Sequence, residues 1–192
     1  MSHTDRDPWV DIKTYHGFKA DHVISALQKE IRRGNEENAA LLAYEMIITS
    51  PAMEDYMWHR LKVMSVEDIG FGDVMAPVIV QSIFEITSAC DRSIAERKLY
   101  AIHVVRYLCG CKKDRSSDDM INWIMHASEN GTAKAIIPDY ALDMHTADGQ
   151  KKGRGRKYFF EEASKTYPEL EGRNKVYLER ILKMLDDGVL TD

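Results

Sequence analysis

Apolar residues recur at spacings of three and four along most of the chain, which is the pattern of amphipathic helices. No run alternates apolar and polar residues for long enough to predict a sheet. The spacing, with the Gly, Asn, Ser and Pro residues that interrupt it, predicts helices over residues 21–33, 36–49, 51–69, 73–86, 92–108, 116–129, 138–146 and 174–187. Short connections between the early helices favour antiparallel neighbours. The predicted fold is all-α, a compact domain of mostly antiparallel helices.

Cap residues and apolar faces add detail to these helices. Asp21 and Asp73 each precede an apolar periodic run and have the chemistry of N-caps. The segment after Asp73 has the densest apolar run and is predicted to be the most buried helix, although its β-branched residues 78–80 also suit a short strand. The residues expected to face inward in the next helix are Ile94, Leu99, Ile102, Val105 and Leu108.

The chain is predicted to have three parts. Residues 1–19 form an N-terminal arm, and Trp9, Tyr15 and Phe18 are expected to dock it on the body. Residues 20–115 form the main helical domain. Residues 116–192 form a helical extension with a basic loop, expected to continue the same domain.

Composition and charge narrow the range of possible functions. Of 192 residues, 44% are hydrophobic and 30% charged, which allows a sizeable core. A formal net charge of −5 argues against a general nucleic-acid coat, since such proteins carry a basic excess, but it leaves room for one basic patch.

Three observations predict a cytoplasmic protein that does not enter a membrane. Cys90, Cys109 and Cys111 are too few for a secreted disulfide framework and are predicted to be ordinary thiols. The polar first eleven residues lack the apolar core of a signal peptide. The longest apolar run, around residues 75–86, is too short and too interrupted to span a bilayer.

Motifs of the common catalytic machineries are missing from the sequence. It contains no G-x-x-x-x-G-K-[ST] phosphate loop, no G-x-S-x-G elbow and no H-E-x-x-H zinc helix. The pair Cys109 and Cys111 has no second pair with which to complete a zinc site. The sequence therefore predicts no enzyme, no catalytic residue, no cofactor and no metal.

A first group of candidate residues surrounds the end of the third predicted helix. Glu67, Asp68 and Asp73 are close in sequence, and adjacent carboxylates can bind a cation or act as acid and base. The alternative is structural, with the carboxylates neutralising nearby arginines. Arg60 can share a helix face with Glu67, so we favour an ordered junction of Arg60, Glu67, Asp68 and Asp73.

A second group is the basic loop over residues 151–157. Five cations lie on a glycine-containing backbone ahead of the aromatic residues 158–160, an arrangement that suits phosphate contacts and base stacking. The alternative is a solvated loop ahead of aromatic residues that belong to the core. The candidate ligands of nucleic acid or another anion are Lys151, Lys152, Arg154, Arg156 and Lys157.

A third group is the polar cluster of Asp139, Asp143 and His145. On the predicted helix the two aspartates share a face and the histidine points elsewhere, which argues against a metal site. These residues either anchor the helix and its loop or serve a small-molecule enzyme.

Three segments carry a resemblance to a known family: residues 24–35 (ISALQKEIRRGN), 39–41 (AAL) and 59–70 (HRLKVMSVEDIG). From Asp21 to about Asp73 the chain resembles the helical collar that follows the ATPase core in clamp-loader-related AAA+ proteins of the replication-associated recombination type. The resemblance implies a helical collar-like fold and assembly into a homotetramer. It fades beyond about Arg115, and the chain contains no ATPase module, so ATP hydrolysis is not implied.

The leading hypothesis is a non-catalytic oligomerisation and interaction module related to these collars. Its expected partner is a second copy of itself, in a homotetramer, with a separate ATPase or DNA as further partners. The first alternative is a nucleic-acid-associated module that uses the basic loop. The second is a small-molecule enzyme that uses Asp139, Asp143 and His145.

Overall fold

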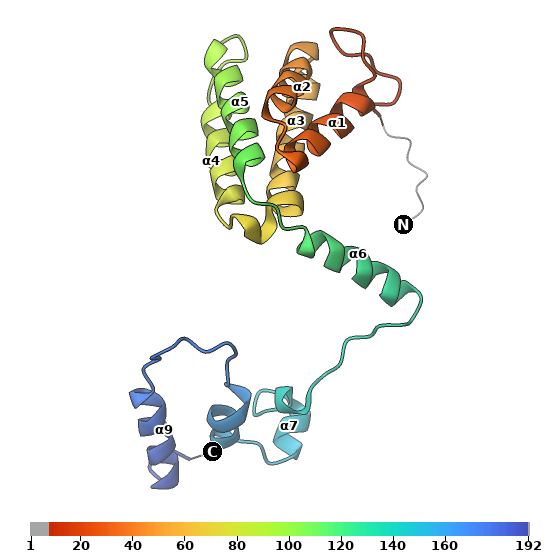
Figure 1. Cartoon of the computed structure of the whole chain (residues 1–192). Helices are drawn as coiled ribbons and strands as arrows, with labels where there is room; N and C mark the ends of the chain where they lie inside the picture. The colour runs from red at the N-terminus through yellow and green to blue at the C-terminus, as the bar shows by residue number, and fades with distance from the viewer. Residues whose placement is uncertain (1–7, 192) are drawn as a thin grey trace. The chain divides into compact units, whose positions relative to one another are not determined.

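The computed structural model describes residues 8–191, which form helices and loops without a strand. The all-α prediction is therefore confirmed (Figure 1). The α-helices are α1 (Ala20–Arg33), α2 (Glu36–Thr49), α3 (Pro51–Met64), α4 (Ala76–Ser88), α5 (Ala95–Gly110), α6 (Ser116–Glu129), α7 (Ala147–Lys151), α8 (Arg156–Tyr158) and α9 (Val176–Asp186). The chain divides into two units, Met1–Thr132 and Ala133–Asp192, so the division falls after α6 rather than before it.

The first unit is a bundle in which α2 packs against α1, α3 and α5, while α4 packs mainly on α5 (Figure 1). The core of the bundle is formed by side chains from all the helices from α1 to α5. Its largest fully buried side chains include Leu27, Ile31, Met46, Met57, Trp58, Leu61 and Leu108. Burying each such side chain stabilises the fold by about 1.5–3 kcal/mol. The unit therefore has a core of its own.

Local signals set most of the early helix ends. Ser50 accepts a hydrogen bond from the Met53 amide at 3.2 Å, and Pro51 takes the first position of α3. Gly34 ends α1 in the left-handed region, at φ 74°. The predicted N-cap of α1, Asp21, lies two residues after the observed one. Lys19 is its N-cap, and Asp21 lies in the first turn, where a carboxylate interacts favourably with the helix dipole.

The prediction that the fourth helix is the most buried is wrong. In α4 only Ala76, Val80 and Thr87 are buried, while Val78 is 56% exposed. The helix is apolar around much of its circumference, but it lies at the edge of the bundle and covers only one face. Residues 78–80 are helical, so a strand there is excluded. Leu99 of α5, predicted to face inward, is also exposed.

The connection from α3 to α4 is tightly folded. The third helix ends at Met64, and a π-helical turn, η1 (Ser65–Ile69), leads into a 3₁₀ turn, η2 (Gly70–Gly72). Gly70 has φ 52°, and a Cβ atom there would collide with the Asp114 carbonyl oxygen. The missing side chain lets the segment before α6 cross η1 closely, and this crossing places Arg115.

The second unit is built from short elements. A 3₁₀ turn over Asp139–Ala141 precedes α7, and a π-helical turn over Phe159–Ala163 follows α8. The predicted helix over 138–146 does not form. Thr146 instead caps α7 by accepting a hydrogen bond from the Gly149 amide at 3.0 Å. No helix in the described part of the chain is long and apolar enough to cross a bilayer.

The N-terminal arm contacts the first unit through one of its three predicted aromatic residues. Trp9 packs against the core, with its ring centroid 5.1 Å from that of Tyr56. Tyr15 and Phe18 are exposed, so their predicted docking is wrong. The arm is also held by polar contacts, because the His16 amide donates to Glu45 at 2.8 Å. Residues 1–7 of the predicted arm lie outside the described residues.

Candidate functional site

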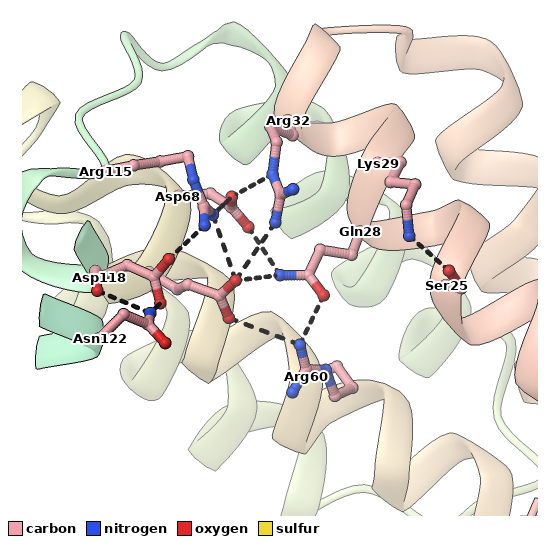
Figure 2. Close-up of polar contacts among 10 residues, drawn as sticks. Ser25, Gln28, Lys29, Arg32, Arg60, Asp68, Arg115, Asp118 and Asn122 are labelled. Atoms are coloured by element: carbon pink, nitrogen blue, oxygen red, sulfur yellow. Dashed lines mark hydrogen bonds and ion pairs between the residues drawn. The ribbon is translucent and has the colours of Figure 1, made fainter. Parts of the chain in front are cut away.

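Six polar residues from α1, α3, η1 and the start of α6 meet in what we call the charged junction (Figure 2). Its members are Gln28, Arg32, Arg60, Glu67, Asp68 and Arg115. Asp68 is at the centre and its side chain is fully buried. It accepts hydrogen bonds from Arg32 Nε at 2.5 Å, from Arg115 Nη1 at 2.6 Å and from Gln28 Nε2 at 3.1 Å. The buried carboxylate is thus fully engaged.

Glu67 joins the remaining members of the charged junction. Its Oε1 accepts from Gln28 Nε2 at 2.7 Å and from Arg115 Nη1 at 3.2 Å. Its Oε2 lies 3.7 Å from Arg60 Nη2, so the two residues meet as their spacing predicts. Gln28, Arg32 and Arg115 were not found from the sequence, because they come from distant segments.

Asp73 lies outside the charged junction and does not cap α4. Its Oδ2 accepts a hydrogen bond from the Tyr107 hydroxyl at 2.7 Å, and its Oδ1 accepts one from the Met75 amide at 3.0 Å. The hydrogen bond from Tyr107, more than any other contact, holds the pKa of Asp73 below its usual value. The N-cap of α4 is Met75. Asp73 therefore ties the turn before α4 to α5.

The charges of the junction favour a structural joint over a metal or acid–base site. Three guanidinium groups face Glu67, Asp68 and Asp118, so no carboxylate is left over for a cation. Burial alone would lower the pKa of Arg115, but hydrogen bonds to Asp68 and Glu67 outweigh it and raise the pKa. Among the described residues no cluster of three or more His, Cys, Asp or Glu side chains is placed to hold a metal.

Arg115 links the charged junction to α6. The same guanidinium that contacts Asp68 also pairs with Asp118, in the first turn of α6. The start of α6 is thereby fixed to α1 and η1, and the rest of the helix leads away from the bundle (Figure 1).

The projecting helix α6 carries an apolar surface. Five large apolar side chains are exposed on it, and only Ala127 is buried. These side chains, which we call the α6 face, are Met120, Ile121, Trp123, Ile124 and Met125. At about 100° per residue they occupy one broad arc, while Asp119, Asn122, His126 and Glu129 occupy the other. With Trp123 60% exposed, the α6 face is a candidate contact surface.

Three adjoining hollows form what we call the apolar trough, which begins beside the first turns of α6 and continues along α4. The first, of about 520 Å³, lies between α3 and the start of α6, and the second, of about 180 Å³, shares Val66 and Ser117 with it. The third, of about 460 Å³, runs along α4 and shares Pro77 with the second. The apolar residues that line this trough are Val63, Val66, Phe71, Val74, Pro77 and Val78.

Each cation of the basic loop is paired inside the second unit. Lys151 pairs with Asp148, Lys152 with Asp139, Arg154 with Asp139, Arg156 with the Thr191 carbonyl and Lys157 with Asp186. Arg154 also donates to the carbonyls of Asp139 and Leu142, and its guanidinium lies 4.4 Å from the centroid of the Tyr158 ring. Phosphate binding by this loop stays a prediction, and it would require these pairs to open.

The three residues of the polar cluster do not share a helix face. Asp139 pairs with Arg154, whereas Asp143 pairs with His145, whose Nδ1 lies 3.1 Å from the carboxylate. The expectation that the two aspartates meet and the histidine points elsewhere is wrong, because the segment turns instead of continuing as a helix. The His145 ring packs edge-on against Phe159, with centroids 5.2 Å apart. These contacts hold the loop in place, and the anchoring role and the small-molecule site both stay predictions.

The Arg154–Asp139 pair gives a pH-dependent prediction. Arg154, followed by Lys152, lowers the pKa of Asp139 to about 2. Because the ordinary value is near 4, the pair stabilises the second unit above about pH 4 and loses this effect as the pH falls towards 2. In Arg154→Ala we expect the Asp139 carboxyl to titrate closer to pH 4, measured by NMR. Lys151→Ala is the control, and an unchanged Asp139 midpoint in Arg154→Ala would contradict the assignment.

Comparison with known protein families identifies the family of this chain. The family model described as MgsA AAA+ ATPase C terminal matches residues 34–179. No curated protein matches the chain. The matched span continues well past residue 115, where the resemblance in the sequence fades, and it extends through the second unit as far as the first turn of α9. The chain therefore belongs to the family of C-terminal helical domains of MgsA-type AAA+ ATPases.

Proposed function

We propose that this chain is a non-catalytic helical module that assembles copies of itself, as a homotetramer, through the α6 face. Membership of the AAA+ C-terminal family supports a helical module of this kind. The observation that carries the proposal is the exposure of five large apolar side chains on one helix that leads away from its own bundle. The engaged carboxylates of the charged junction are suited to hold that helix, not to catalyse a reaction.

The energetic argument concerns the cost of leaving the α6 face in water. Burying one large apolar side chain contributes about 1.5–3 kcal/mol, so covering several of them is enough to drive association. Scattered apolar residues are ordinary on a protein surface, but a contiguous group on one helix marks an interaction site. Trp and Met are also enriched at protein interfaces, and Trp123 and Met120 are the most exposed of the large apolar residues described on α6.

The test is the mass of the full chain in solution, measured by light scattering over a range of concentrations. We expect a tetramer for the natural sequence and a smaller species for Trp123→Glu, because a charge within the α6 face opposes its burial. Leu41→Glu is the matched control, since Leu41 is equally exposed but lies on α2, and it should keep the natural mass. Circular dichroism checks that both variants fold. A natural chain that stays monomeric at every concentration would refute the proposal.

A further inference from the structure

We infer that the second unit obtains its hydrophobic core from the second unit of a neighbouring copy, through a hollow between the π-helical turn η4 (Phe159–Ala163) and α9. This inference rests on the proposed function, because it needs copies that assemble through the α6 face. It adds a second contact between the copies and makes the folding of the second unit depend on assembly.

The second unit has no apolar core of its own. Across its described residues, 133–191, the only buried residues are Asp143 and Gly149, and α9 contributes none. A domain of about 60 residues is only marginally stable even with a core. The ion pairs inside the unit, such as that of Lys157 with Asp186, are exposed, and exposed pairs contribute little to stability. Apolar burial against another surface is therefore needed to offset the entropy lost when the unit becomes ordered.

The hollow between η4 and α9 has a volume of about 420 Å³. The apolar residues that line it are each half-buried, and they are Phe160, Leu178 and Leu182. The loop over residues 164–175 also lines it, and on this loop Tyr167 and Leu170 are 99% and 79% exposed. An apolar hollow and exposed apolar side chains thus occur next to each other on every copy. In a two-fold pair, each loop covers the hollow of the other copy.

Charge favours another second unit over a strongly charged partner. Residues 133–192 contain as many Lys and Arg as Asp and Glu residues, so the net charge of −5 belongs to the first unit. The charged residues that line the hollow are Glu161, Lys165, Glu169, Arg173 and Lys175. Each of them has an ion-pair partner within the same unit. This balance gives nucleic acid or a basic segment no electrostatic advantage, and two such neutral units do not repel each other.

The proposed contact through the α6 face brings second units together. The helix α6 ends at Glu129 and the second unit begins at Ala133, so the chain between them spans at most about 14 Å. Copies joined through α6 therefore hold their second units at a high local concentration, which favours even a weak contact between them. A partner from outside the assembly lacks this advantage.

Hydrogen exchange of the full chain tests whether the second unit folds on assembly. We expect fast exchange of the α9 amides where light scattering shows a monomer. In the assembled chain the exchange should be slower, by about 100-fold at 100 times the dissociation constant. Trp123→Glu should show the fast α9 exchange at concentrations where the natural chain is assembled. The amides of the core helix α2 are the internal control and should change much less.

Two further variants test the contact surface itself. Tyr167→Glu and Leu170→Glu place a charge beside the hollow at exposed positions, where neither disturbs an isolated unit. In the assembled chain each should return the α9 exchange towards the fast rate, because the charge opposes burial by the neighbouring copy. Leu41→Glu, at an exposed apolar position of the first unit, is the matched control and should keep the slow exchange.

Mass and exchange together separate this inference from the proposed function. A natural chain that assembles while its α9 amides exchange as fast as in Trp123→Glu would overturn the inference and leave the proposed function standing. The inference also fails if both Tyr167→Glu and Leu170→Glu keep the slow natural exchange, since the unit is then covered elsewhere. A natural chain that is monomeric at every concentration contradicts the proposed function, and the inference fails with it.

Discussion

Replacing Glu54 with alanine is expected to destabilise the first unit by about 3–5 kcal/mol, the usual effect of breaking a buried ion pair. Glu54 and its partner Arg97 are both buried. Arg97 Nη2 donates to Glu54 Oε1 at 2.7 Å, and Arg97 Nε donates to the same oxygen at 3.1 Å. Removing the carboxylate leaves a guanidinium charge inside the bundle without its counterion.

The loss of Glu54 is expected to affect more than one ion pair, because Arg97 also contacts the end of another helix. Arg97 Nη1 donates to the carbonyl oxygens of Thr87 at 2.6 Å and Cys90 at 2.8 Å. It thus satisfies carbonyls at the C-terminal end of α4, while Glu54 belongs to the first turn of α3. The pair joins α3, α4 and α5, so its loss loosens the edge helix α4 most.

Urea denaturation followed by circular dichroism measures the free energy of unfolding. Glu54 also accepts a hydrogen bond from Arg92, an exposed residue that pairs with Asp55 as well. Asp55→Ala is the matched control, because it removes a neighbouring carboxylate from an exposed pair, and such a pair contributes about 0–1 kcal/mol. Replacing both buried partners, as Glu54→Leu with Arg97→Met, should recover part of the stability, since no buried charge then remains. A loss below about 1 kcal/mol for Glu54→Ala would show that Arg97 is rehydrated and that the pair is not a core element.

The helices themselves are predictable from local sequence. Gly34 ends α1, and Ser50 with Pro51 begins α3, in each case through contacts within a few residues. The side of each helix that becomes buried is less predictable. The apolar runs of α4 and α6 have the pattern of core helices, yet Val78 and Trp123 are exposed. An apolar helix face indicates that another surface packs against it, but the sequence does not show whether that surface belongs to the same chain or to another one.

Contacts between charged residues are even harder to predict when the two partners are far apart in the sequence. Arg60 and Glu67 lie two helical turns apart, so the sequence indicates their contact. Arg115 reaches Glu67 across 48 residues, and Lys157 reaches Asp186 across 29, where no local signal exists. The basic loop looks free in the sequence because two of its acidic partners, Asp139 and Asp186, are remote along the chain. Ion pairing of this kind follows from packing.

Asp68→Ala is expected to lower the stability of the first unit by about 2–3 kcal/mol and to release α6 from the bundle. The carboxylate is fully buried and accepts from Arg32, Arg115 and Gln28. The predicted loss is smaller than for Glu54→Ala because the Arg32 and Arg115 side chains are about one third exposed, at 32% and 29%, and can rehydrate. Glu67→Ala, at the rim of the same junction, is the milder comparison.

Hydrogen exchange separates the two effects of Asp68→Ala. Amides in the first turns of α6, around Asp118 and Ile121, should exchange faster in this variant, while those of the core helix α2 change only with global stability. If the exchange of α6 is unchanged, Arg115 does not hold the helix through Asp68.

The same variant links the charged junction to assembly. Asp68 is buried and contributes nothing to the α6 face or to the lining of the trough, so a direct effect on association is not expected. If Arg115 positions α6 for the second copy, Asp68→Ala should reduce the mass in solution at concentrations where the bundle is still folded. Trp123→Glu should reduce the mass without loss of stability. Asp68→Ala that unfolds more easily yet assembles normally would show that the α6 face does not depend on the junction for its position.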